Sequence, residues 1–525
     1  MKHQNRKSNI GKLTLFFLSF IAIIYSIEYT QPQFSLFQDS HDKAVQTFSL
    51  WENRFQTDNL YYPAKNFDPK LEFFHLPTNL HVIHDGKLLS AFPVQFALLM
   101  APLLSLIPLH FLPYTSIFFL FLGLWILRKF YGFSMFLLWV SYFTTFLWPL
   151  SWEYSELPAV FALTTFGLLP FLRENRVKLM EALSGISLGW VMIVRLETIV
   201  FFGIFFIFHF YYFSKSKRQF ALVSYLKTYK LFLTAFILFI VTNLYLNYVT
   251  SGHILGTRFL ANSNGFSAGF EQRLQWLKSL LFFSDQKIGF FGYIPLALLL
   301  FTVYWIRFNK ISNRKKALLF ASSGMLIIIP WIAPNDGFNN WGPRFYTIVI
   351  TAYLILLKPY FSYFYHKKKK FFFLFLFTFG IFSFSLGVIG AKIQKSKTNL
   401  SKKSATILAE IQPDILVYQD YLNLYTCGTF YFNHTVVIAN NMDSITRLLE
   451  NASHTNTHKS IAFITWNPIL ISKELKEAIN ENKRKSGYPL ADWDEALLES
   501  NMKKYVTEFQ ILDKQNYRIW TGKFK

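Results

Sequence analysis

The sequence contains very little cysteine and little charge. A single cysteine, Cys427, occurs in 525 residues, so an intramolecular disulfide is excluded and the redox compartment is left undetermined. Only 16% of the residues are charged, whereas 52% are hydrophobic and 20% are aromatic. The apolar residues occur in long runs and not in the periodic stripes of soluble helices. This composition excludes an ordinary soluble domain and indicates that the solvent of the chain is a bilayer.

Several sequence motifs of soluble enzymes are also missing. The chain has no glycine-rich phosphate loop, no zinc-ligand spacing, no nucleophile elbow and no haem or ferrous ligand set. A cytoplasmic ATP-driven machine is therefore disfavoured, and we expect no cofactor. Loop carboxylates are suitable ligands for a divalent ion, but no ligand spacing identifies a metal site.

Acidic residues are scarce relative to basic ones. The chain has 30 Asp and Glu against 53 Lys and Arg, which gives a net charge of +23. The cations cluster between hydrophobic runs, the pattern of short cytoplasmic loops under the positive-inside rule. We therefore expect a lipid bilayer and no nucleic acid as partner. The main clusters are Arg128-Lys129, Arg173 to Lys178, Lys215 to Arg218, Arg307 to Lys316 and Lys367 to Lys370.

The hydrophobic runs predict a polytopic all-α membrane bundle with about eleven transmembrane helices, since a span needs about twenty apolar residues. The first run follows a basic tail but lacks a small-residue cleavage site, so we expect an uncleaved helix and not a signal peptide. The expected spans are Leu13–Ile27, Tyr114–Leu127, Phe133–Leu150, Leu157–Leu172, Leu179–Val194, Ile199–Phe213, Leu231–Val249, Ile288–Ile306, Ala317–Ala333, Phe345–Leu357 and Phe371–Ala391.

The run Leu88–Leu112 is apolar but differs from the others. A full crossing there would place Arg128-Lys129 on the wrong side, and Pro93, Pro102 and Pro108 interrupt a straight helix. We therefore expect one re-entrant or interfacial helix, which is permitted where irregular backbone lines a cavity. An ordinary span with one exposed basic pair is the alternative.

The cationic loops also predict the orientation of the chain. We expect an integral plasma (inner) membrane protein with a cytoplasmic N-terminus, so that the polar loops fall on the extracytoplasmic face. Residues 1–391 form the expected transmembrane domain, with a large first outer loop at 28–88 that holds eight acids. Residues 392–525 form a small C-terminal extracytoplasmic α/β domain. Its expected strands are Ile415–Tyr418, Thr435–Ala439 and Ile461–Thr465, and its expected helices are Ser444–Asn451 and Ser472–Lys483.

The first outer loop carries the candidate catalytic acids. Asp39 and Asp42 lie about a dozen residues after the first span, within reach of the membrane surface. A carboxylate there is suited to act as general base toward an acceptor hydroxyl, with His41 as a modulator. The alternative is structural, with Asp39 as the N-cap of a helix from Ser40 to Trp51 and Asp42 at its third position.

Candidate substrate-binding residues lie in the expected outer turns. Arg344 follows the turn that starts at Asn335 and is placed either to grip an anionic headgroup or diphosphate, or to snorkel at the interface. Arg195 is either a turn residue between two short helices or a second cation for the same anion. The remaining candidates are Arg258, Glu153 and, more weakly, the loop residue Lys87, which is a phosphate contact or simply solvated.

These motifs together resemble the GT-C type integral-membrane glycosyltransferases, which use polyprenyl-phosphate sugars, and in particular the bacterial mannosyltransferase-like members. The similar elements are a first span with an acidic outer loop, a Gly-Lys…Phe-Pro entry, a Gly-x-x-x-Gly…Arg-x-Glu stretch and a Trp-Gly-Pro-Arg turn. The corresponding residues are Asp39 to Asp42, Gly86-Lys87, Phe92-Pro93, Gly185, Gly189, Arg195, Glu197 and Trp341 to Arg344.

The resemblance implies transfer of a hexosyl or pentosyl group from a polyprenyl-phosphate carrier to a glycan, lipid or protein acceptor on the outer face. It assigns the base to a first-loop carboxylate, here Asp39 with Asp42 as the reserve, and the donor phosphate to basic residues. Two other classes remain open on sequence grounds: a lipid or glycan transporter or flippase, and a catalytically inactive membrane scaffold.

Overall fold

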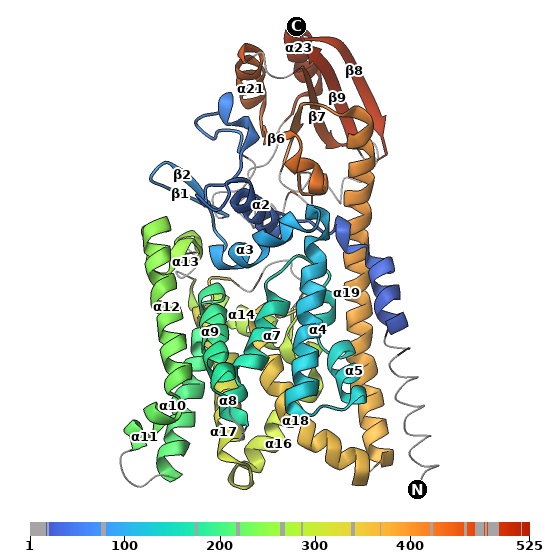
Figure 1. Cartoon of the computed structure of the whole chain (residues 1–525). Helices are drawn as coiled ribbons and strands as arrows, with labels where there is room; N and C mark the ends of the chain where they lie inside the picture. Colours follow the sequence, from blue (N-terminus) through green and yellow to red (C-terminus); the bar gives the residue numbers. More distant parts are fainter. Residues whose placement is uncertain are drawn as a thin grey trace. The chain divides into compact units, whose positions relative to one another are not determined.

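The computed structural model of the protein is mostly helical (Figure 1). The structure describes residues 17, 20–74, 80–173, 177–216, 221–262, 268–284, 287–335, 337, 342–367, 369–420, 424–455, 459–467, 477, 480, 493–515 and 517–525.

The chain folds as two compact units, each built from two stretches of sequence. The first, called the helical unit below, comprises Met1–Pro32 and Phe111–Lys395. The second, called the mixed unit, comprises Gln33–His110 and Ser396–Lys525. The stretch 33–110 therefore folds with the C-terminal residues, although the sequence grouped the loop 28–88 with the membrane domain. The assignment of 1–391 and 392–525 to a membrane and an outer domain stays a prediction.

Six helices in the described part of the chain are long and apolar enough to cross a membrane. Each has at least 18 residues, close to the length that the hydrocarbon core of a bilayer requires. The chain therefore has the character of a membrane protein, while the expected count of about eleven spans is not confirmed. The six are Leu109–Tyr131, Thr198–Ser216, Lys230–Ser251, Asn313–Ile332, Arg344–Tyr363 and Leu376–Ile411.

Several of the other expected spans are shorter or broken. The run 133–150 forms α5 (Met135–Phe143) and a separate short helix, α6 (Leu147–Leu150). The run 157–172 forms α7 (Leu157–Gly167) and a separate short helix, α8 (Leu169–Leu172). The first turn of α8 contains a proline, which is favoured at a helix start. Expected spans also correspond to α9 (Lys178–Val194) and α16 (Pro295–Ile306), which have 17 and 12 residues.

Basic side chains close the C-terminal end of α4 (Leu112–Tyr131). The helix ends at Gly132, which adopts a left-handed φ of 67° and bonds through its N–H to the Leu127 carbonyl. The Arg128 guanidinium donates to the Phe133 carbonyl at 2.6 Å, and the Lys358 ammonium donates to the Tyr131 carbonyl. Cations at this end complement the partial negative charge of the helix terminus. Arg128 and Lys358 thus each bind a backbone carbonyl near the end of α4.

The N-terminal stretch of the mixed unit contains short elements. A hairpin of β1 (His81–His84) and β2 (Lys87–Ser90) turns through Asp85 and Gly86, both with positive φ, as a two-residue hairpin turn requires. The run 88–112 then breaks at its prolines, as expected. Its pieces are α3 (Val94–Met100), η3 (Ala101–Ser105) and η4 (Leu109–Phe111), and the re-entrant or interfacial placement stays a prediction.

The C-terminal stretch forms a five-stranded sheet of order β6-β5-β7-β9-β8 (Figure 1). The three predicted strands are confirmed as β5 (Ile415–Tyr418), β6 (Thr435–Ile438) and β7 (Ser460–Trp466), which are parallel. The antiparallel strands β8 (Val506–Lys514) and β9 (Tyr517–Phe524) complete the sheet. The predicted helix 444–451 lies inside α21 (Met442–His454), and α23 (Glu495–Tyr505) precedes β8. The predicted helix 472–483 lies almost wholly outside the described residues.

Candidate functional site

The two candidate acids lie in the first turn of α2 (Asp39–Glu52) in the mixed unit. The helix begins at Asp39 itself, and the residue in the N-cap position is Gln38, with a φ of 49°. The expectation that Asp39 is the N-cap is therefore wrong by one position. As first-turn residues, Asp39 and Asp42 still favour the positive end of the helix, and Asp39 stays half-buried whereas Asp42 has no exposed surface.

Asp42 lies in a buried aromatic environment. The Tyr425 hydroxyl donates to its Oδ2 at 3.2 Å, and His41 Nδ1 lies 3.5 Å from its Oδ1. Burial raises the pKa of the Asp42 carboxyl, and the Asp39 carboxylate adds to this, while His41 and Tyr425 act against it. Asp42 is therefore held by two neighbours, Tyr425 and His41, and the half-buried Asp39 is the more exposed member of the pair.

The C-terminal stretch of the mixed unit supplies aromatic neighbours of Asp42 and His41. Tyr425 belongs to η8 (Tyr425–Phe432) and is separated from Asp42 by 383 positions. Tyr431 of the same element packs edge-on against the His41 ring, with centroids 5.1 Å apart. These tyrosines were not identifiable from the sequence, since neither lies in a charged or turn-forming motif.

Lys87 is exposed at the start of β2. Its described electrostatic partner is Asp58, whose pKa is raised by burial and lowered in part by Lys87. Among the described contacts, none joins Lys87 to Asp39 or Asp42. Lys87 is thus a surface residue of the hairpin.

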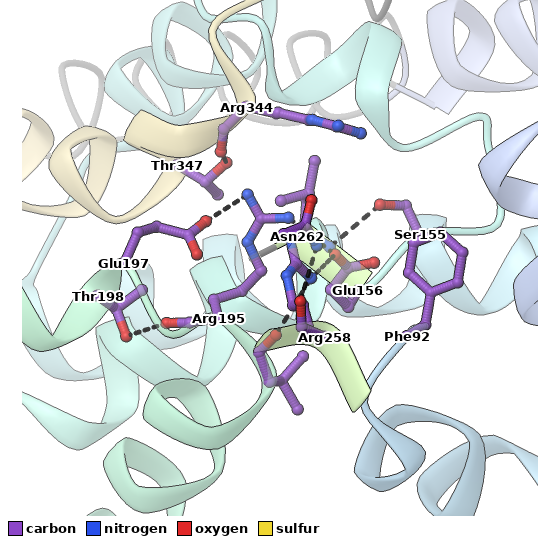
Figure 2. A network of polar contacts seen from close by, with 12 residues as sticks. Phe92, Ser155, Glu156, Arg195, Glu197, Thr198, Arg258, Asn262, Arg344 and Thr347 are labelled. Atoms are coloured by element: carbon purple, nitrogen blue, oxygen red, sulfur yellow. Dashed lines mark hydrogen bonds and ion pairs between the residues drawn. The ribbon is translucent and has the colours of Figure 1, made fainter. Parts of the chain in front are cut away.

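A buried ion cluster is the most distinctive feature of the helical unit (Figure 2). Arg195 lies at the break between α9 and α10 (Thr198–Ser216), in a non-helical conformation that the Thr198 hydroxyl stabilises by donating to its carbonyl. Its guanidinium lies 3.1 Å from Glu156 Oε1 and 2.5 Å from Glu197 Oε1. The side chains of Arg195 and Glu156 are each 3% exposed. The expectation that Arg195 is a turn residue between helices is confirmed.

Arg258 joins the same cluster from α13 (Gly256–Asn262). Its Nη1 lies 3.9 Å from Glu156 Oε1, and its side chain is 18% exposed. Burial, together with the positive charges of Arg195 and Arg344, lowers the pKa of Arg258 to about 10, while Glu197 and Glu156 act in the opposite direction. With this pKa the Arg258 guanidinium is protonated at neutral pH. A third arginine close by makes its protonated form less stable.

That third arginine is Arg344, in η7 (Arg344–Tyr346). The guanidinium carbons of Arg195 and Arg344 lie 5.5 Å and 5.9 Å from the ring centre of Phe345, so both cations are close enough to interact with this ring. A Cβ on Gly337 would lie 3.5 Å from Arg344 Nε, so the described part of the preceding turn packs against Arg344. Trp341 of that turn lies outside the described residues.

The structure thus brings Arg195, Arg258 and Arg344 together and leaves Glu153 aside. Glu153 is half-buried in the segment before α7, and the carboxylate that the arginines contact belongs to Glu156. Among the described ion pairs, Arg195 contacts Glu156 and Glu197, and Arg258 contacts Glu156, while Arg344 lies near enough for its charge to act on Arg258. Several guanidinium groups in a partly desolvated place are suited to an anion such as a phosphate.

No protein-family model matches the chain, and no curated protein matches it in sequence. The residues themselves are therefore the basis on which a function is inferred.

Proposed function

We propose that the chain is a membrane glycosyltransferase of the GT-C type, which transfers a sugar from a polyprenyl-phosphate carrier to an acceptor on the extracytoplasmic face. The observation that carries this proposal is the cluster that brings the guanidinium groups of Arg195, Arg258 and Arg344 together in the helical unit. A lipid phosphate needs cations beside apolar helices, and this unit contains both. The motifs in which Arg195, Arg344 and Asp39 lie are those that resemble the family.

The reaction assigns a role to each group. Asp39 takes the proton from an acceptor hydroxyl, and the oxygen then attacks the anomeric carbon of the donor sugar. The bond between that carbon and the phosphate oxygen breaks, and polyprenyl phosphate leaves with the bonding electrons. The arginines stabilise the negative charge of the leaving phosphate by forked hydrogen bonds, and fixed donors at the developing charge are an effective source of catalysis.

The buried Asp42 is suited to a supporting role in this scheme. Its hydrogen bond from Tyr425 and its contact with His41 fix the first turn of α2, on which Asp39 lies. Asp42 stays the reserve candidate for the base. Lys87 and Glu153 are secondary candidates for contacts with the donor or acceptor.

The proposal includes an orientation in the membrane. We infer about eleven crossings, a re-entrant segment at 88–112, a cytoplasmic N-terminus and an extracytoplasmic C-terminal domain. The support is the position of the cations: Arg128 and Lys129 lie in the last turn of α4, and Lys215 lies in the last turn of α10. Under the positive-inside rule these helix ends face the cytoplasm.

The test uses the full chain in lipid nanodiscs and in proteoliposomes, with a radiolabelled polyprenyl-phosphate sugar and a membrane extract that supplies acceptors. Glycosyl transfer predicts a covalent labelled product and release of polyprenyl phosphate. Movement of the label across the proteoliposome membrane without a covalent product would identify a transporter or flippase instead. Neither product nor movement, with wild-type protein that is folded, would favour the inactive scaffold.

A further inference from the structure

The parallel part of the sheet in the mixed unit has a topological switch point. The chain runs from β5 to β6 on one side of it, and then across β5 to β7 on the other side. In open sheets of parallel strands, ligands bind outside the carboxyl ends of the strands at the place where the connections diverge. The carboxyl ends of β5, β6 and β7 are therefore the place to look for a binding site.

Three polar residues occupy equivalent positions at this edge. Tyr418, Ile438 and Ile464 are paired in one row across the three strands, and Asp420, Asn440 and Trp466 each follow two residues later. The strands stay joined in between, because Ala439 N–H donates to the Tyr418 carbonyl and Gln419 N–H donates to the Ile464 carbonyl. The three residues therefore occupy the same position relative to one row of paired residues, at the carboxyl edge of three neighbouring strands.

Two polar atoms of this row are buried and unsatisfied. In the described structure, Asn440 Oδ1 and Trp466 Nε1 have almost no accessible surface and no hydrogen-bond partner. Buried polar atoms in folded proteins nearly always have a partner, and an exception calls for an explanation such as a ligand. The two atoms come from neighbouring strands on either side of Asp420, whose side chain is 3% exposed.

The chemistry of the row favours one class of ligand. An amide oxygen and a carboxylate accept hydrogen bonds, whereas an indole N–H can only donate one. A cation cannot accept from the indole, and an anion is repelled by the Asp420 carboxylate. Hydroxyl groups both donate and accept. Trp466 also stacks on Tyr517, with ring centres 5.1 Å apart and planes 16° apart, which fixes an aromatic surface for the apolar face of a sugar ring.

We propose that the carboxyl edge of β6, β5 and β7 binds a neutral sugar through Asn440, Asp420 and Trp466. This site goes beyond the transfer reaction, because sugar binding there requires neither Asp39 nor the arginine cluster. If the chain is a glycosyltransferase, the site gives the mixed unit an affinity for a glycan acceptor. This acceptor role rests on the proposed function, whereas sugar binding itself does not.

The test is saturation-transfer NMR on the full chain in nanodiscs. The probes are the methyl glycosides of mannose, galactose, glucose and N-acetylglucosamine, each measured separately. Trp466→Phe keeps the aromatic surface and removes the indole N–H, and Asn440→Ala removes the amide. Each should weaken binding about 3- to 10-fold, the effect of one lost hydrogen bond. The control is Asn433→Ala, at an exposed asparagine of the same unit.

Three results would overturn the proposal: no saturation transfer to any of the four glycosides, full binding in both edge variants that retain the wild-type melting temperature, or displacement of a bound glycoside by equimolar inorganic phosphate. Binding that is lost in the edge variants supports the site even if the chain transfers no sugar. Transfer without glycoside binding would refute the site and leave the proposed function standing.

Discussion

At the scale of single residues, Asp42 shows how burial changes the behaviour of a carboxyl group. The side chain has no exposed surface, and burial raises its pKa above the ordinary value of 3.8. The folded state therefore holds this proton more tightly than the unfolded chain does. Stability from this group is complete below the unfolded pKa and is lost as the pH rises through the raised folded pKa.

This linkage gives a prediction for Asp42→Asn. The variant cannot ionise, so its melting temperature should fall less than that of the wild type, or rise, between pH 4 and pH 7. Differential scanning fluorimetry across this range measures the difference. The control is Asp443→Asn, which removes an exposed carboxylate from α21 and should follow the wild-type curve. Parallel curves for Asp42→Asn and the wild type would contradict the assigned burial.

Arg344→Lys tests the phosphate-binding role. Lysine keeps the charge but loses the planar fork, so it makes fewer directed bonds to a phosphate. We expect kcat/KM for the polyprenyl-phosphate donor to fall about 10- to 100-fold, the equivalent of one or two charge-assisted hydrogen bonds. Initial rates at varied donor concentration provide the measurement. Arg307→Lys, the same change at an exposed arginine after α16, should keep the wild-type value.

The sequence indicated some of these residues and could not have indicated others. Arg195 and Arg344 were identifiable because charges beside apolar runs are costly and need a reason. Glu156 and Glu153 were equivalent in the sequence, and only the fold shows which one contacts Arg195. The Tyr425 contact with Asp42 joins positions 383 apart and leaves no local pattern.

At the scale of elements, the packing of α9 against α12 (Lys230–Ser251) fixes the arginine cluster. A Cβ on Gly185 would lie 2.4 Å from the Phe232 carbonyl oxygen, and one on Gly189 would lie 2.9 Å from the Phe239 ring. Small residues spaced in this way let two helix backbones approach closely within a membrane. Arg195 follows α9 directly, and Arg258 follows α12 on α13, so this contact sets the distance between them.

Gly185→Ala should therefore disturb both stability and transfer. The added methyl group meets the α12 backbone, which cannot move aside as a side chain would, and overpacking of this kind costs about 1–3 kcal/mol. We expect a lower melting temperature and a lower transfer rate. Gly203→Ala in α10 is the matched control, since nothing lies within 4 Å of its added Cβ. Equal melting temperatures for the two variants would refute the close contact.

The broken helices show what hydropathy can and cannot predict at this scale. The run 133–150 has the composition of one span, but α5 ends at Phe143. The Thr144 and Thr145 hydroxyls donate to the carbonyls of Val140 and Ser141 at this point. A hydropathy count measures transfer into lipid and does not register such local bonds between side chains and the backbone. By contrast, the proline breaks in 88–112 were predictable, because proline removes a backbone donor.

At the scale of the whole molecule, the order of the chain does not follow the order of the compact units. The stretch 33–110 interrupts the helical unit and folds with residues 396–525. The three parallel strands of the C-terminal sheet were predictable from their short β-branched runs, whereas β8 and β9 were not predicted. The association of two stretches separated by almost the whole helical unit was not, since only the folded chain brings them together.

Sidedness is testable with introduced cysteines, because the natural Cys427 is buried. Lys87 and Lys310 are both exposed, and the proposed orientation places them on opposite sides of the membrane. A membrane-impermeant maleimide should label Lys87→Cys in intact spheroplasts and should label Lys310→Cys only after permeabilisation. The unaltered chain is the control for Cys427. Labelling of Lys310→Cys in intact spheroplasts would contradict the orientation.

The central claim is sugar transfer from a polyprenyl phosphate with Asp39 as the base. The most direct measurement compares the wild type with Asp39→Asn, at equal amounts of folded protein in nanodiscs, for covalent transfer of labelled sugar. Asparagine fills the same space but cannot take the proton, so we predict a loss of at least about 100-fold in rate with an unchanged melting temperature. Full transfer by Asp39→Asn would contradict the assigned base, and no transfer by the wild type would contradict the function.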